Sequence, residues 1–345
     1  MSSLKQVAHE AGVSPATVSR VLNKSANVSA DTRVRVEKAI RVLRYQPNRV
    51  ARRLRTQDRS SKLIGVLVPD IQNPFYVEVV RGIEDRAYAN HYAVLMCNFA
   101  QEEAKERLYL DIMQSESVDG LIVAPAHQRD RKVVDLARSG LPIVCVDRGL
   151  SGIDVDVIVV DNRHGAREAV EHLARLGHRR IAYVAGLPQI PSTMERLQGY
   201  EDALSSRGID KDEELVRFGD SKHESGRRLT RELLDLPHPP TALFTGNNLI
   251  TLGALETIHG RGLRIPDEVA IVGFDDMYWS ISLNPPLTPV SQPGHESGLR
   301  AADMLFQRIA EPDRPCAKLV LKTTLVVRRS CGSRPTPQSG DGGDS

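Results

Sequence analysis

The 345-residue sequence has few cysteines, few aromatic residues and no long apolar run. Its four cysteines, Cys97, Cys145, Cys316 and Cys331, are widely spaced and form no C-x-x-C pair. This spacing argues against a disulfide framework and against a structural zinc site. No apolar run approaches the roughly 18–20 residues that a transmembrane helix needs. The opening residues, MSSLKQVAHE, hold no apolar signal-peptide core, so we expect a cytoplasmic protein.

Several enzyme motifs are also missing. We find no G-x-x-x-x-G-K-[ST] phosphate loop, no G-x-G-x-x-G after a strand and no G-x-S-x-G elbow. His-Glu-Ser-Gly occurs at 223–226 and 295–298, but neither copy has the second histidine of the zinc motif H-E-x-x-H. We therefore expect no enzyme, no cofactor and no metal site. Each copy should instead begin a helix, with its glutamate in the first turn.

The charge is divided unevenly along the chain, although the net charge is only +2. Residues 1–60 hold 13 basic and four acidic residues, a net of +9, and the remaining 33 basic and 40 acidic residues give −7. Such an asymmetry indicates a basic nucleic-acid-binding module joined to an acidic body. The alternative, a solvated basic tail, fails if the segment has a folding pattern of its own.

The basic segment shows three helix starts. Ser3 and Gln6 form a capping box, and Gly12 is placed to end the first helix in the left-handed conformation. Ser14 caps a second helix, with Pro15 at its first position. Ser29 caps a third helix that runs to about residue 43. The core positions that we expect in this third helix are Val34, Ala39, Ile40 and Leu43.

Two short helices with a tight turn, followed by a third, predict a helix-turn-helix whose second helix enters the major groove. Ser19, Arg20 and Asn23 share the polar face of that helix, and Arg20 suits a bidentate contact to guanine. Pro15 and Ala16 offer apolar contacts. Any one of these polar residues alone is better explained as a solvated helix face. The caps, the charge and the spacing together favour DNA binding.

From residue 63 onward, apolar strand-like runs alternate with helical stretches, which predicts two doubly wound α/β lobes of parallel sheet. Ligands bind such folds beyond the carboxyl ends of the strands. The strands that we expect are Leu63–Val68, Ala93–Met96, Leu121–Val123, Ile143–Val146, Val157–Val160, Ile181–Val184, Ala242–Phe244, Val269–Val272 and a short one from Thr288 to Gln292.

Polar and aromatic side chains follow these strands in both series. Carboxylate, guanidinium and amide groups can each bond two adjacent hydroxyls, and aromatic rings can stack on a sugar face. Each residue also has a simpler explanation, since an Asp-Arg pair is commonly a surface ion pair and an Asn after a strand is commonly a helix cap. The candidate effector-binding residues are Asn73, Phe75, Tyr76, Asp147, Arg148, Arg196, Asn247, Phe274, Asp275 and Gln292.

Residues 4–56 resemble the DNA-binding region of the lactose-repressor/galactose-repressor family of bacterial transcription regulators, through VAHEAGVSPATVSRVLN, VSADTR and YQPNRVARRL. The resemblance implies a hinge helix over Asn48–Arg55 and an apolar wedge, Leu54, in a kinked central minor-groove step. By itself, Leu54 would be read as a packing residue in a basic linker. The DNA-contacting residues that we expect are Leu4, Ser14, Pro15, Ala16, Thr17, Ser19, Arg20, Asn23, Asn27, Asn48, Ala51 and Leu54.

Residues 63–329 resemble the effector domain of the same family, which is similar to periplasmic sugar-binding proteins, through VDGLIVAP, LGHRRIAYVAG and IPDEVAIVGFDD. The candidate residues most resemble a ribose-type pocket. Two departures stand out. Ser221 replaces the aromatic stacker of ribose and purine binders, and Ile190 replaces the arginine of the purine-responsive relative.

We therefore expect a helix-turn-helix domain over 1–46, a hinge and linker over 47–62, a two-lobed effector and dimerisation domain over 63–329, and a disordered tail over 330–345. We expect the chain to cross from one lobe to the other near residues 161, 292 and 322. The function expected is an effector-controlled repressor that binds a pseudo-palindromic operator as a homodimer, with a sugar such as a pentose as effector. The alternatives are a solute-binding protein of a sugar transport system and an enzyme on a doubly wound fold.

Overall fold

The computed structural model describes residues 3–22, 27–45 and 60–333, and the chain divides into two units at Ser61–Lys62. We call the described residues of the first unit the head and those of the second the body, and describe each by itself. None of the helices within these ranges is long and apolar enough to cross a membrane.

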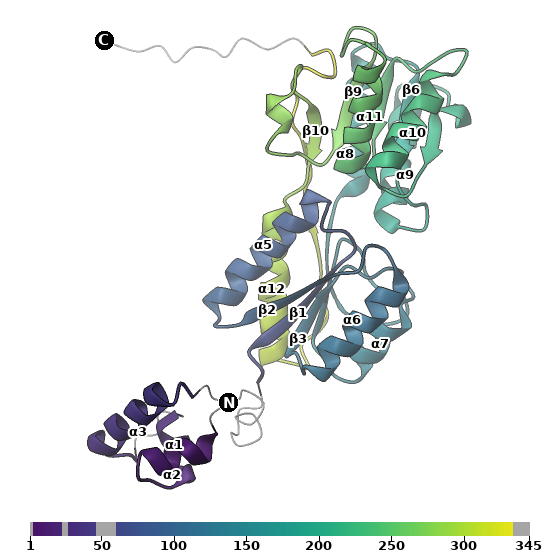
Figure 1. Cartoon of the computed structure of the whole chain (residues 1–345). Helices are drawn as coiled ribbons and strands as arrows, with labels where there is room; N and C mark the ends of the chain where they lie inside the picture. The colour runs from purple at the N-terminus through teal and green to yellow at the C-terminus, as the bar shows by residue number, and fades with distance from the viewer. Residues whose placement is uncertain (1–2, 23–26, 46–59, 334–345) are drawn as a thin grey trace, which may run out of the picture. The chain divides into compact units, whose positions relative to one another are not determined.

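The head consists of three short helices around a small apolar core (Figure 1). The predicted helix starts are confirmed: Ser3 and Gln6 form both bonds of the capping box, Gly12 has a φ of +62°, and Ser29 accepts a bond from the Thr32 amide. The helices are α1 (Leu4–Glu10), α2 (Pro15–Leu22) and α3 (Ala30–Val42).

One predicted core position of the head is wrong. Val34 is 61% exposed, whereas Val36 is completely buried beside Ala39. The inward face of α3 is set by its packing on α1 and α2, and Val34 lies two residues, or about 200°, around the helix from Val36. Ala39 is buried as expected, and Ile40 and Leu43 pack half-buried against the same core.

The body contains two six-stranded sheets, which confirms the predicted doubly wound α/β architecture. Sheet A has the strand order β11-β5-β4-β3-β1-β2 and is parallel throughout. Its runs of buried apolar residues are typical of parallel strands that are covered on both faces. The strands are β1 (Leu63–Val68), β2 (Ala93–Asn98), β3 (Gly120–Val123), β4 (Ile143–Val146), β5 (Asp156–Val160) and β11 (Lys318–Leu321).

Sheet B repeats this arrangement in the order β12-β10-β9-β8-β6-β7, and only the β10–β12 pair is antiparallel. The sequence patterns missed the short strands β7, β11 and β12, because each has only two to four residues. The strands are β6 (Ile181–Ala185), β7 (Val216–Phe218), β8 (Ala242–Thr245), β9 (Ala270–Phe274), β10 (Thr288–Ser291) and β12 (Thr324–Leu325).

Two helices cover each face of each sheet, as Figure 1 shows for sheet A, with α5 and α12 on one face and α6 and α7 on the other. On sheet B, α8 and α9 cover one face and α10 and α11 the other. We call sheet A with its helices lobe 1 and sheet B with its helices lobe 2. The helices are α5 (Pro74–Ala89), α6 (Glu103–Ser115), α7 (Arg131–Arg138), α8 (Asn162–Arg175), α9 (Pro191–Ser206), α10 (His223–Leu234), α11 (Asn248–Gly260) and α12 (Gly294–Ala310).

The chain passes from one lobe to the other three times, at 161, at 292–293 and at 322–323, where β5, β10 and β11 end. We call these passages the crossovers. Both His-Glu-Ser-Gly copies begin helices, α10 and α12, as expected. Each is packed tightly on a neighbouring helix: a Cβ on Gly298 of α12 would lie 2.0 Å from the Val79 carbonyl oxygen of α5, and one on Gly226 of α10 would lie 2.5 Å from the Ile250 oxygen of α11.

The predicted tail begins too early. Ser330 and Cys331 are both buried, and Ser330 Oγ donates to the Ile271 carbonyl and accepts from the Thr288 amide. These bonds attach the segment after β12 to sheet B, and Cys331 belongs to the lobe 2 core. Residues 334–345 of the predicted tail lie outside the described residues.

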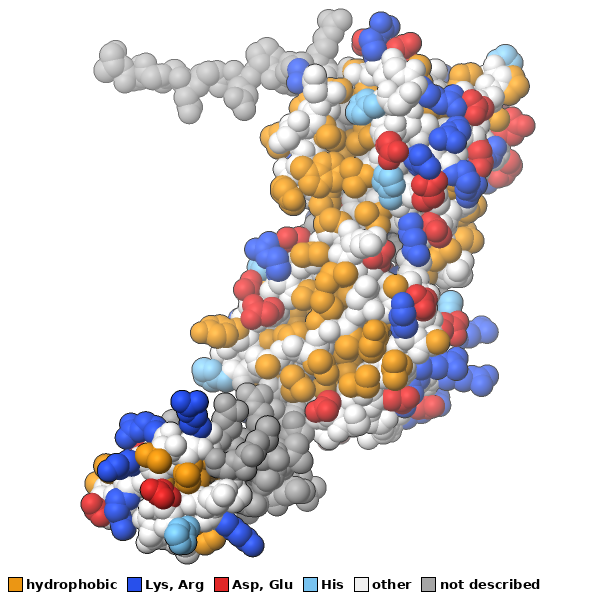
Figure 2. All heavy atoms as spheres, in the orientation of Figure 1, with side chains coloured by type: hydrophobic (Ala, Val, Ile, Leu, Met, Phe, Trp, Pro, Cys, Tyr) orange, Lys and Arg blue, Asp and Glu red, His pale blue; other side chains and the backbone are white. Residues whose placement is uncertain are grey.

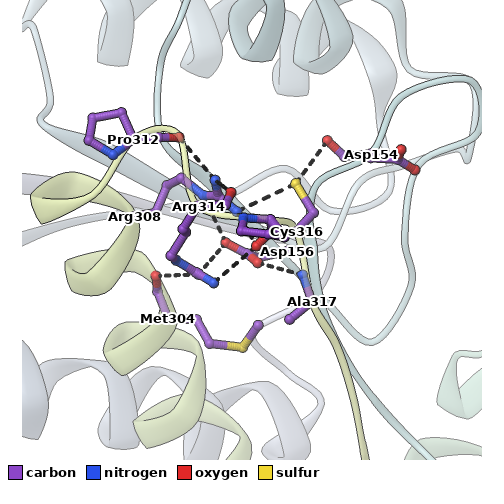
Figure 3. Close-up of polar contacts among 9 residues, drawn as sticks. Asp154, Asp156, Met304, Arg308, Pro312, Arg314, Cys316 and Ala317 are labelled. Carbon is purple, nitrogen blue, oxygen red and sulfur yellow. Dashed lines mark hydrogen bonds and ion pairs between the residues drawn. The ribbon is translucent and has the colours of Figure 1, made fainter.

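A buried ion-pair cluster closes lobe 1 at the end where its strands begin (Figure 3). Asp156, the fully buried first residue of β5, accepts from Arg308 Nε at 3.1 Å, Arg314 Nη2 at 2.5 Å and the Ala317 amide at 2.9 Å. Arg308 also donates to the carbonyls of Pro312 and Pro315. The carboxylate thus fixes the loop between α12 and β11.

Candidate functional site

A cleft in the body lies where the carboxyl ends of the strands of both sheets meet. It brings together nine of the ten candidate effector-binding residues, although they are spread over more than 200 positions of the sequence. The nine are Asn73, Phe75, Tyr76, Asp147, Arg148, Arg196, Asn247, Asp275 and Gln292.

Lobe 1 contributes a buried ion pair to the cleft. Asp147 follows β4 with a φ of +66°, and its Oδ2 lies 2.9 Å from Arg148 Nη1. The Tyr76 hydroxyl, from the first turn of α5, donates to the same Oδ2 at 3.0 Å. Burial raises the pKa of Tyr76 above its usual range, so this phenol stays a hydrogen-bond donor. Arg148 is fixed in turn by its Nε bond to the Pro125 carbonyl at 2.5 Å.

Lobe 2 contributes Arg196, which α9 presents from its second turn. Its Nε donates to Asn162 Oδ1 at 2.9 Å, its Nη1 donates to the Gly246 carbonyl, and the guanidinium lies 3.7 Å from the centre of the Phe274 ring. Two acceptor oxygens and the ring therefore hold the guanidinium in one plane, facing the cleft.

Phe274 is the candidate that does not line the cleft. Its side chain is completely buried in the lobe 2 core beneath Arg196. The prediction that it stacks directly on a sugar ring is therefore wrong. Phe274 supports Arg196 through a cation–π contact instead.

Asp275 lies beside the second crossover with both carboxylate oxygens engaged. Gln292 Nε2 donates to Oδ1, and the Asn248 amide donates to Oδ2 at 3.3 Å. Burial raises the pKa of Asp275, and the positive charge of Arg196 opposes that shift. A ligand hydroxyl placed here would meet a desolvated carboxyl group, where a hydrogen bond is stronger than in water.

The two candidate asparagines that the sequence also allowed as caps are indeed helix caps. Asn73 Oδ1 accepts from the Phe75 amide at 2.9 Å, and Asn247 Oδ1 accepts from the Ile250 amide at 2.8 Å. Capping and lining the cleft are compatible here, because both helices begin at its edge. Asn247 Nδ2 additionally donates to the Ser221 carbonyl.

Ser221 and Ile190, the two departures noted in the sequence, both line the cleft. Ser221 has a φ of +66°, and its Oγ lies close to Gly186, so this part of lobe 2 offers a small hydroxyl where an aromatic ring would otherwise lie. Sequence reasoning missed six further polar lining residues, all of which lie just after a strand or at a helix start. They are Asp70, Gln101, His127, Gln189, Ser192 and Thr193.

The cleft offers hydrogen-bonding groups from both lobes and apolar rings from lobe 1, an arrangement that can bind a small molecule with several hydroxyls. Within the described ranges, no cluster of three or more His, Cys, Asp or Glu side chains could hold a metal ion.

In the head, the candidate DNA-contacting residues of α2 share one surface. Ala16 and Arg20 are exposed and Ser19 is half-buried, whereas Val18 and Val21 face the core. Ser14 Oγ accepts from the Thr17 amide at 3.1 Å, which fixes the start of α2. Pro15 and Asn27 are also exposed, and Leu4 is half-buried at the start of α1. Asn23, Asn48, Ala51 and Leu54 lie outside the described residues.

Comparison with known proteins gives matches over both units. Residues 3–48 match the family described as "Bacterial regulatory proteins, lacI family", and residues 61–325 match "Periplasmic binding proteins and sugar binding domain of LacI family". The HTH-type transcriptional repressor CytR of Escherichia coli K12 is 34% identical and covers 97% of both chains.

Two solved structures are also similar. The lac repressor dimer bound to operator and the anti-inducer ONPF aligns with a TM-score of 0.80 at 30% identity, over 96% of this chain and 99% of that one. A LacI family transcriptional regulator from Enterococcus faecium with bound ribose aligns with a TM-score of 0.71 at 30% identity, over 78% of this chain and 98% of that one.

Proposed function

The chain belongs to the LacI family of bacterial regulatory proteins, and from this premise we propose that it represses transcription from operators that it binds as a homodimer, under the control of a sugar bound in the cleft. It is a DNA-binding transcriptional regulator, not an enzyme. The helix-turn-helix match argues against a solute-binding protein of a transport system. The protein acts in the cytoplasm, and we propose that it associates there with the nucleoid.

The exposed face of α2 supports the DNA-binding part of the proposal. Arg20 projects from the exposed side of a capped helix whose opposite side is the head core. In the major groove, its guanidinium could bond guanine O6 and N7 together. Selection of duplexes from a random library by the full-length protein, followed by footprinting, tests this part. Two half-sites related by a dyad support it, and binding without sequence preference contradicts it.

The observation that carries the effector proposal is the pair of carboxylates, Asp147 and Asp275, that opposite lobes present to one cleft beside the guanidinium groups of Arg148 and Arg196. Carboxylate and guanidinium groups bond neighbouring hydroxyls in one plane. A compact polyol such as a pentose therefore matches the cleft. A purine base is less suited, because Ser221 and Ile190 provide neither a stacking ring nor a charged donor.

A thermal-shift screen of pentoses, hexoses and nucleosides tests this class of effector. A ligand present at 100 times its Kd stabilises the folded body by about 2.7 kcal/mol, which raises Tm measurably. We expect the largest rise with a pentose or a compound that contains one. A rise confined to free purine bases would contradict the proposal.

We propose that the homodimer forms through the face of the body that carries α5. Ile71 and Val77 are each more than a third exposed there, and Val77 lines one groove together with Tyr278 of lobe 2. Tyr278 and Ile281, three residues further on, are 91% and 64% exposed. Figure 2 shows hydrophobic side chains gathered on this face. Tyr278→Ser with Ile281→Ser should shift the protein to monomers in analytical ultracentrifugation. An unchanged dimer would place the interface elsewhere.

A further inference from the structure

Two asparagines from different lobes hydrogen-bond to each other at the edge of the cleft. Asn248 Nδ2, at the first residue of α11 in lobe 2, donates to Asn73 Oδ1 in lobe 1 at a distance of 2.8 Å. Asn248 is only 1% exposed and does not line the cleft. Its side chain is therefore available for a contact between the lobes rather than for a ligand.

The lobe 1 acceptor is held in place by its own helix. The same Asn73 Oδ1 accepts from the Phe75 amide at 2.9 Å, so the α5 cap fixes the oxygen that Asn248 must reach. A movement of lobe 2 away from lobe 1 would break the Asn73–Asn248 bond. Asn73 Oδ1 would then lose a donor that helps to hold it in place, which loosens the α5 cap. The bond thus depends on how the lobes are placed relative to each other.

Asn248 is also joined to the cleft. Its backbone amide donates to Asp275 Oδ2 at 3.3 Å, and the other oxygen of Asp275 accepts from Gln292 at the second crossover. A continuous chain of hydrogen bonds therefore runs from Gln292 through Asp275 and Asn248 to Asn73. A ligand that bonds Asp275 would act on a group one hydrogen bond away from the contact between the lobes.

The Asn73–Asn248 bond leaves the other polar atom of the Asn248 side chain without a partner in the described part of the chain. No donor among the described residues reaches the buried Asn248 Oδ1. A buried acceptor without a partner costs at least as much as one ordinary hydrogen bond contributes. If the lobes parted, water could satisfy both amide groups. The unpartnered oxygen offsets the gain from the Asn73–Asn248 bond, so this bond does not by itself fix the lobes in one arrangement.

We propose that Asn73 and Asn248 form an inter-lobe latch, and that Asn248 is a positioning residue that sets the balance between closed and open lobes. The inference rests on the proposed function in that the cleft is the effector site. A ligand that contacts both Asp147 and Asp275 holds the lobes together and thereby keeps the latch made. A protein whose latch is broken has to close its lobes before the ligand can contact both carboxylates. Its apparent affinity for the ligand is therefore reduced in proportion to the fraction of molecules that are closed.

The test is hydrogen–deuterium exchange of the full-length protein without ligand or DNA, comparing the parent with Asn248→Ala. We expect exchange over residues 73–77 to become about two- to tenfold faster, which corresponds to the loss of one net hydrogen bond. Thr257→Val is the matched control. It removes a buried bond from the same helix, Thr257 Oγ1 to the Arg227 carbonyl, which lies wholly inside lobe 2.

Faster exchange over 73–77 in Asn248→Ala but not in Thr257→Val supports the latch. Equal exchange in the parent and Asn248→Ala overturns it. If Asn248→Ala fails to fold by circular dichroism, Asn248→Asp answers the same question, because it keeps the shape but places a carboxylate against Asn73 Oδ1. No effector is needed, so a failed sugar screen would count against the proposed function and leave the latch result standing.

Discussion

Asp147 and Asp275 occupy equivalent positions in the two lobes. Each follows the strand that is fourth along the chain in its sheet, β4 or β9. Each has a positive φ (+66° and +79°) and donates its amide to the neighbouring strand, at the carbonyls of Ile158 and Val290 respectively. The left-handed conformation is uncommon for a residue other than glycine. The repetition of this conformation indicates that both sheets use the same local turn to direct a carboxylate into the cleft.

The first prediction concerns these two carboxylates. Asp147→Asn and Asp275→Asn should each weaken binding of the best sugar from the thermal-shift screen by roughly 10- to 150-fold, the value of a hydrogen bond to a charged group. Titration calorimetry measures the loss. Asp111→Asn, which alters an exposed ion pair with Lys132, is the control and should bind normally. Normal binding by both cleft variants would mean that the effector lies elsewhere.

The second prediction separates DNA binding from effector binding. Arg20→Ala should weaken binding to the selected operator by about 1–3 kcal/mol, because it removes a bidentate base contact. The sugar-induced rise in Tm should stay the same. Arg107→Ala, an exposed arginine on α6, is the control for charge. Equal loss of operator and sugar binding in Arg20→Ala would contradict independent roles for the head and the body.

The third prediction concerns pH. Burial raises the pKa of Glu106 from 4.5 to about 8, with a further contribution from the charge of Asp130. The unfolded state therefore releases this proton first as pH rises. Stability contributed by the protonated carboxyl is present below about pH 4.5 and is lost between pH 4.5 and 8, at a slope of at most about 1.4 kcal/mol per pH unit.

Urea denaturation across that range measures this effect. Glu106→Gln keeps an acceptor for the Ala126 amide without an ionisable group, so its free energy of unfolding should decline less than that of the parent. Parallel curves for the two proteins would rule out this carboxyl as the source. Ala126 lines the cleft, so sugar affinity should fall near pH 8, where the folded protein loses this proton, in the parent only.

The fourth prediction concerns the Asp156 cluster. Asp156→Ala leaves two buried guanidinium groups without their carboxylate and should lower the free energy of unfolding by about 3–5 kcal/mol. Asp154→Ala changes an exposed carboxylate two residues away and should shift it by no more than about 0.5 kcal/mol. A loss below about 1 kcal/mol in Asp156→Ala would show that the arginines find other partners.

The fifth prediction concerns helix packing. Gly298→Ala should cost about 1–3 kcal/mol, because the added Cβ meets the Val79 carbonyl oxygen and pushes α12 away from α5. Gly260→Ala, at the end of α11, meets nothing within 4 Å and should be neutral or should stabilise by about 0.5–1 kcal/mol. Thermal denaturation distinguishes the two. Equal Tm values for the two variants would mean that α12 can move away from α5 without a loss of stability.

Much of the fold was predictable because local signals carry it. The cap residues Ser3, Ser14 and Ser29 and the apolar runs of the long strands act within a few residues of themselves, so one sequence suffices to read them. The cleft was predictable as well, because ligands bind parallel α/β folds beyond the carboxyl ends of the strands.

Other features depend on distant neighbours. Strand β9 is buried on both faces, so its sequence pattern does not tell whether Phe274 faces the cleft or the core. The adjacent asparagines Asn247 and Asn248 look alike in sequence, yet one caps α11 and the other reaches lobe 1. The burial of Ser330 follows from Ile271 and Thr288, about 60 and 40 positions earlier.

The three crossovers also fix an order of events during synthesis. Lobe 1 lacks α12 and β11, and lobe 2 lacks β12, until the ribosome has passed residues 310, 321 and 325. The head needs only its first 45 residues. The head of a nascent chain can therefore fold early in translation. The effector-binding body becomes complete only near the end of translation.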